Sequence, residues 1–73
     1  MSRTLTEDHS ERLAELLIRM GVNRETRLEV LVGIETPQEC KAFLDILSES
    51  NYEMTSEEVY QAMVEALEET VDL

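Results

Sequence analysis

Apolar residues recur along this chain in four blocks, each with the spacing of an α-helix. In the first block they share one helix face, at Leu13, Leu16, Leu17 and Met20. This pattern predicts a helix from about Thr6 to Met20, with Thr6 or Thr4 as its N-cap. Gly21 then stands where a left-handed C-cap ends a helix, and Val22 can fold back on Leu17.

The second block is ambiguous between helix and strand. Asn23 is a good N-cap and Gly33 a good stop, which predicts a short helix over residues 24–32. Residues 28–34 are rich in aliphatic and β-branched side chains and can alternatively form a strand. A lone strand leaves its backbone groups unpaired, so we favour the helix.

The third block carries a clear helix start. Thr36 and Glu39 form a capping box, and Pro37 occupies the first helical position. The buried stripe is predicted at Cys40, Phe43, Leu44 and Leu47. The helix should end within residues 48–51, where Asn51 tolerates the left-handed conformation.

The fourth block begins with a second capping box, formed by Thr55 and Glu58. Met54 and Val59 are placed as a hydrophobic staple across this start. The apolar stripe that follows is predicted at Tyr60, Met63, Val64, Leu67 and Val71.

Together these blocks predict an all-α fold, a compact bundle of four short helices. The joints are only a few residues long, so neighbouring helices should pack antiparallel. Residues 1–73 form a single small acidic helical domain in this interpretation. A core this small gives little net stability, so we expect either idealised helix packing or self-association.

Charge narrows the classes of partner. The chain has 17 acidic and 6 basic residues, a net charge of −11. Nucleic acid and anionic membranes are therefore poor partners, because both attract basic proteins. No apolar run has the length of a membrane span, and the first residues lack the apolar core of a signal peptide. We expect a cytoplasmic protein.

The charge is also unevenly distributed. All 6 bases lie within residues 1–41, whereas residues 42–73 hold 9 acids and no base. The polar side of the fourth helix is predicted to carry Glu57, Glu58, Glu65, Glu68, Glu69 and Asp72. This face is either a solvated surface or a docking face for a basic protein, or for the arginine-bearing half of a second copy.

Little in the sequence points to catalysis. Cys40 and His9 are the only residues of their kinds, so no disulfide or zinc set exists, and residues 45–58 lack the glycine of a calcium loop. Cys40 is expected to be a small buried hydrophobe. Size and acidity are similar to those of acyl carrier proteins, but Ser48 and Ser56 lack that family's serine motif. We expect no enzyme, cofactor or metal site.

Three functional hypotheses remain. The first is a non-catalytic interaction module, a regulator, adaptor or inhibitor that binds a basic protein surface, with Tyr52 as a further contact. The second is an obligate homodimer whose interface draws on Leu31, Ile34, Tyr60 and Val64. The third, a helix-turn-helix DNA-binding protein, is disfavoured because acids flank Arg24 and Arg27 in the second helix.

Overall fold

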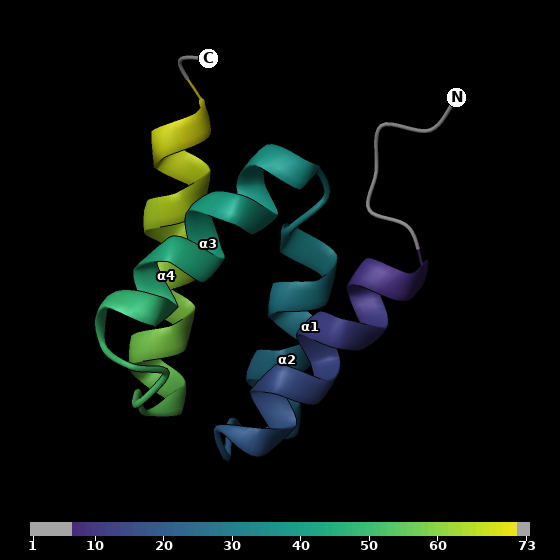
Figure 1. Ribbon diagram of the computed structural model, residues 1–73, viewed down its shortest axis with the longest axis vertical. Coiled ribbons are helices and arrows are strands. Elements are labelled where there is room, and N and C mark those ends of the chain that lie inside the picture. The colour runs from purple at the N-terminus through teal and green to yellow at the C-terminus, as the bar shows by residue number, and fades with distance from the viewer. Residues whose placement is uncertain (1–6, 72–73) are drawn as a thin grey trace.

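The computed structural model describes residues 7–71, which form four helices and no strand. They are α1 (Glu7–Arg19), α2 (Arg24–Gly33), α3 (Pro37–Glu49) and α4 (Ser56–Thr70). Helices α1 and α2 form one helical hairpin, and α3 and α4 form the other (Figure 1). The most extensive contact joins α3 and α4, and α2 connects the two hairpins by packing on both α4 and α1. The all-α prediction is confirmed, and residues 28–33 lie in a helix rather than a strand.

The predicted helix starts are confirmed wherever the structure describes them. Thr36 and Glu39 form the capping box of α3, with the Glu39 N–H donating to Thr36 Oγ1 at 3.2 Å and the Thr36 N–H donating to Glu39 Oε1 at 3.1 Å. Thr55 and Glu58 do the same for α4 at 3.2 and 2.8 Å. Asn23 caps α2. Thr4 and Thr6 lie outside the described residues.

Two helix ends share one backbone motif. After α1, the Gly21 N–H donates to the Ile18 carbonyl and the Val22 N–H to the Leu17 carbonyl, both at 3.0 Å. After α3, Asn51 and Tyr52 make the equivalent bonds, at 3.0 and 2.9 Å. This is the Schellman motif, which satisfies the last carbonyls of a helix. As predicted, Gly21 (φ 80°) and Asn51 (φ 58°) are left-handed.

Gly33 has a different role from the one predicted. It is the last residue of α2 and not its left-handed stop, and Ile34 follows as an extended C-cap. A Cβ added to Gly33 would lie 2.8 Å from Met63 Sδ of α4. The glycine therefore lies where α2 and α4 approach closely, and a side chain at this position requires the Met63 side chain to shift.

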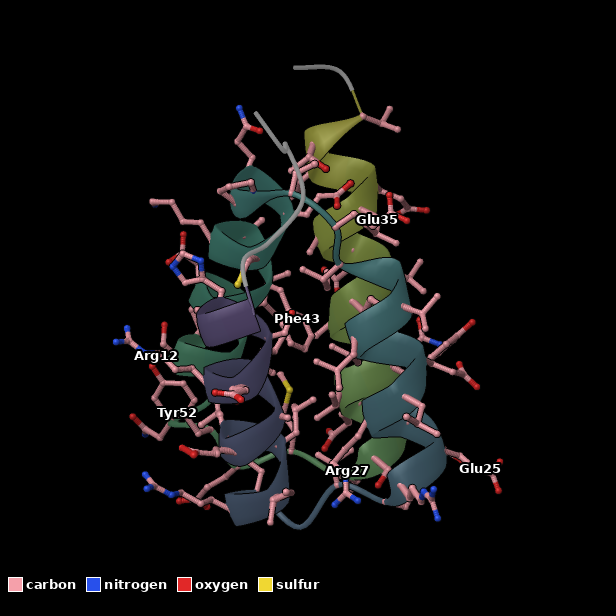
Figure 2. All side chains as sticks on the ribbon, turned by 90° about the vertical axis from the view of Figure 1, so that its right-hand side faces the viewer. Arg12, Glu25, Arg27, Glu35, Phe43 and Tyr52 are labelled. Atoms are coloured by element: carbon pink, nitrogen blue, oxygen red, sulfur yellow. The ribbon has the colours of Figure 1, made fainter. Side chains whose placement is uncertain are left out.

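The core lies between the two hairpins, with Phe43 at its centre (Figure 2). No polar or charged side chain is buried among the described residues. The buried residues are Leu13, Leu17, Val22, Val30, Ile34, Phe43, Leu47, Val59, Ala62, Met63 and Ala66. Cys40 and Leu44 are only half-buried, so the stripe predicted for α3 is confirmed chiefly at Phe43 and Leu47.

The stripe predicted for α4 is wrong at both of its ends. Tyr60 is 38% exposed and Val71 77% exposed, whereas Ala62 and Ala66 are buried. Small side chains let α4 approach its neighbours closely, so the packed face follows the alanines and not the largest apolar residues. Ile34 was predicted to contribute to a dimer interface, but its side chain is only 2% exposed. It is therefore not available to such an interface.

The first helices of the two hairpins share a pattern of burial, although the sequence has no evident repeat. Helices α1 and α3 are each 13 residues long, and their starts are separated by 30 positions. Leu13 and Leu17 lie at the same distances from the start of α1 as Phe43 and Leu47 do from the start of α3, and all four side chains are buried. A long-range hydrogen bond joins the hairpins at their turns, from the Asn23 N–H to Ser56 Oγ at 3.0 Å.

Candidate docking surface

A shallow hollow of about 480 Å³ follows the line where α3 packs on α4. Its floor is largely apolar and consists of Ala42, Ile46 and Met54 together with Ser50, all half-buried. Its rim is acidic, with side chains of both helices: Asp45 and Glu49 from α3, Glu65 and Glu69 from α4. We call this hollow, with its four rim carboxylates, the acidic groove.

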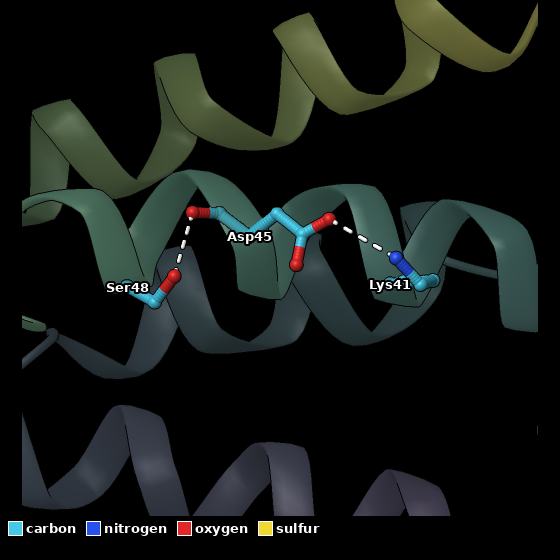
Figure 3. Close-up of polar contacts among 3 residues, drawn as sticks. All are labelled: Lys41, Asp45 and Ser48. Atoms are coloured by element: carbon cyan, nitrogen blue, oxygen red, sulfur yellow. Dashed lines mark hydrogen bonds and ion pairs between the residues drawn. The ribbon is translucent and has the colours of Figure 1, made fainter.

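The acidic groove has one base beside it. Lys41 Nζ lies 3.4 Å from Asp45 Oδ2, an exposed i, i+4 ion pair on α3 (Figure 3). Such a pair contributes only a few tenths of a kcal/mol. Glu49, Glu65 and Glu69 form no ion pair with any described residue. Three of the four rim carboxylates therefore lack a basic partner among residues 7–71.

A second hollow of about 720 Å³ lies between α2 and α4. It shares Met54 and Glu65 with the acidic groove, and its other acids are Glu29, Glu57 and Glu58. Carboxylates thus continue from the acidic groove around α4 to the side that faces α2. Without any base on α4, this helix presents a negative surface on both flanks.

The predicted acidic face is divided by the structure. Glu65 and Glu69 line the acidic groove, while Glu57 and Glu58 line the second hollow. Glu58 also has a structural task, because its Oε1 accepts the N–H of Thr55 at 2.8 Å. Glu68 is exposed and lines neither hollow, and Asp72 lies outside the described residues.

Asp45 and Glu49 were not predicted as site residues. Their signal in the sequence is the i, i+4 spacing of two acids on α3, beside its apolar stripe. That spacing does not say which helix lies along this flank. The site arises only when α4 packs there, and it brings acids together that are 16 to 24 positions apart.

Tyr52 is not part of the acidic surface. Its left-handed backbone (φ 60°) follows Asn51 at the end of α3, and its side chain is 43% exposed. The ring lines a cavity of about 300 Å³ between α1 and α3, together with Arg12 (Figure 2). Tyr52 therefore belongs with the Schellman turn and with the cavity lined by α1 and α3.

The same cavity contains the two residues with the most catalytic potential. His9 and Cys40 both line it, beside Leu13, Leu16 and Leu44. Burial raises the pKa of the Cys40 thiol above its usual value, so the thiol remains protonated and weakly nucleophilic at neutral pH. No group of three or more His, Cys, Asp or Glu side chains within the described part of the chain has the arrangement of a metal site.

Comparison of the chain with protein-family models, with curated proteins and with solved structures finds no match. Within residues 7–71, none of the helices combines the length and the apolar character needed to cross a bilayer.

Proposed function

We propose that this protein is a non-catalytic interaction module that binds a basic segment of another protein in the acidic groove. The observation that carries the proposal is the convergence of four carboxylates from α3 and α4 around an apolar floor.

The form of the groove suggests which side chains it accepts. Arginine and lysine have an aliphatic stem and a cationic tip. The stem fits the floor of Ala42, Ile46 and Met54, while the tip reaches the rim carboxylates. Arginine suits the site better than lysine, since its planar guanidinium can bond two carboxylate oxygens at once. A basic, amphipathic segment is thus the expected partner.

Charge also determines how such a complex forms. The rim is solvent-exposed, so each ion pair contributes modestly to affinity and the negative field chiefly accelerates encounter. A net charge of −11 extends this attraction beyond the groove itself. Binding should therefore weaken as ionic strength rises.

Charge reversal on one helix tests the proposal. The probe is a synthetic amphipathic peptide of arginine and leucine, titrated by fluorescence anisotropy at low and moderate ionic strength. We expect the pair Glu65→Lys and Glu69→Lys to weaken binding about tenfold or more at low salt, because two attractions become repulsions. Glu58 is left intact because its carboxylate caps α4.

The matched control reverses two exposed acids on α1, Glu11→Lys and Glu15→Lys. It changes the net charge by the same amount but on a helix that does not pack against α4. We expect it to weaken binding less than about threefold through the long-range field alone. Equal losses for the two pairs, or no loss for the α4 pair, would contradict a site in the acidic groove. A second control peptide with glutamine in place of arginine should not bind.

A further inference from the structure

Helix α2 exposes large apolar side chains on its outer face. Leu28 is 51% exposed and Val32 is 73% exposed, whereas Val30 between them is fully buried. Residues four apart lie one above the other on a helix, so Leu28 and Val32 form one short stripe that points away from the core. Exposed apolar stripes of this kind often mark interaction surfaces.

The charge of α2 suggests what covers this stripe. The helix has two arginines and two glutamates and is neutral as a whole, unlike α4 with five acids and no base. Two copies of a molecule with a net charge of −11 repel each other over most of their surface. The outer face of α2 is where they can approach at the least electrostatic cost.

We infer that the outer face of α2 binds the same face of a second copy, with the two helices antiparallel. When Leu28 of one copy lies opposite Val32 of the other, Arg24 of the first comes close to Glu35 of the second. In two antiparallel copies of a helix, residues that lie equally far from a common midpoint, on opposite sides of it, face each other. The midpoint between residues 28 and 32 nearly coincides with the midpoint between residues 24 and 35, so both pairs can form in one arrangement. Both Arg24 and Glu35 are exposed, and Glu35 stands just beyond the end of α2 (Figure 2).

The geometry also determines how strong this dimer is. Helix α2 has 10 residues and is therefore about 15 Å long. One such face from each copy falls below the roughly 1,200 Å² that stable interfaces bury in total. The dimer is consequently weak and reversible, not the obligate dimer of the sequence-based hypothesis. Its antiparallel helix dipoles add a small favourable contribution.

Analytical ultracentrifugation of the full chain from about 10 µM to about 1 mM tests the inference, since this range spans weak association. We expect the unmodified protein to shift toward dimer mass as its concentration rises. The pair Leu28→Ser and Val32→Ser should weaken dimerisation tenfold or more, because it removes the apolar area that the interface buries. The control Val71→Ser changes a side chain of similar exposure on α4, and it should have no effect.

A charge swap tests the antiparallel arrangement. Arg24→Glu and Glu35→Arg should each weaken the dimer about three- to tenfold, since the pair occurs twice in a two-fold symmetric dimer. The double variant should recover the original association. Arg24→Glu places a negative charge at the N-terminus of α2, and Glu35→Arg places a positive charge beyond its C-terminus. Both charges interact favourably with the helix dipole, so we expect the fold to be preserved.

A protein that stays monomeric to about 1 mM overturns the inference. So does association that ignores the α2 variants, or a double swap that fails to recover the dimer. Because the acidic groove lies on α3 and α4, the pair Glu65→Lys and Glu69→Lys is expected to leave the α2 dimer in place. Failure of one proposal is therefore distinguishable from failure of the other.

Discussion

Left-handed residues end two of the four helices, and one of them is a glycine with open space around it. Gly21 has a φ of 80°, and a Cβ added there meets nothing within 4 Å. Any cost of a side chain at this position therefore comes from the backbone. Asn51 and Tyr52 also adopt the left-handed region, although neither is glycine. Among residues other than glycine, asparagine is one of those that tolerate this region best.

Gly21→Ala is expected to lower the free energy of unfolding by about 1 kcal/mol, because alanine is strained in the left-handed region. Urea denaturation followed by circular dichroism measures this loss. Asn51→Gly is the opposite control at the matching turn, and it should leave stability unchanged or slightly raised. A Gly21→Ala variant as stable as the original protein would show that the Schellman turn does not require glycine.

Helix boundaries were largely predictable because capping is local. A capping box needs only four consecutive residues, and both boxes at the starts of α3 and α4 are formed. The packed face of α4 was not predictable in the same way. It depends on how closely α4 approaches its neighbours, and the buried Ala62 and Ala66 have weak hydrophobic signals in the sequence.

The close approach of α2 to α4 yields a second stability prediction. Gly33→Ala gains about 1 kcal/mol of helix propensity, but its methyl group would lie 2.8 Å from Met63 Sδ. Overpacking of this kind typically costs about 1–3 kcal/mol, so we expect a net loss of about 1 kcal/mol. The loss should shrink when Met63→Val removes the contacting sulfur.

A double-mutant cycle of Gly33→Ala and Met63→Val, measured by urea denaturation, separates the gain in helix propensity from the cost of the contact between the two residues. Additive effects would mean that the contact between Gly33 and Met63 does not limit the packing of α2 on α4. Gly21→Ala serves as a reference, since its cost has a backbone origin and should not change with Met63→Val.

Helices α1 and α3 share a pattern of burial, but the two hairpins differ in charge. Residues 1–41 contain all 6 bases, and residues 42–73 contain 9 acids without a base. This separation is evident from the sequence, and it places several acids on α4. The sequence could not show that α3 supplies half of the groove's rim, because Asp45 and Glu49 meet Glu65 and Glu69 only through tertiary packing.

The division of surfaces follows from this asymmetry. The exposed apolar stripe belongs to the neutral helix α2, whereas the acidic groove is formed by α3 and α4. We propose that the first serves self-association and the second binds a basic partner. Both can then be occupied at once, and two linked grooves would strengthen binding to a partner with repeated basic segments.

Backbone amide chemical shifts, recorded by NMR while the arginine–leucine peptide is added, test the central proposal most directly. We expect the largest changes around Ala42, Ile46, Met54 and Glu65, with little change in α1. Shifts spread evenly over the molecule, or concentrated in the α1–α3 cavity around Tyr52, would contradict a docking site in the acidic groove.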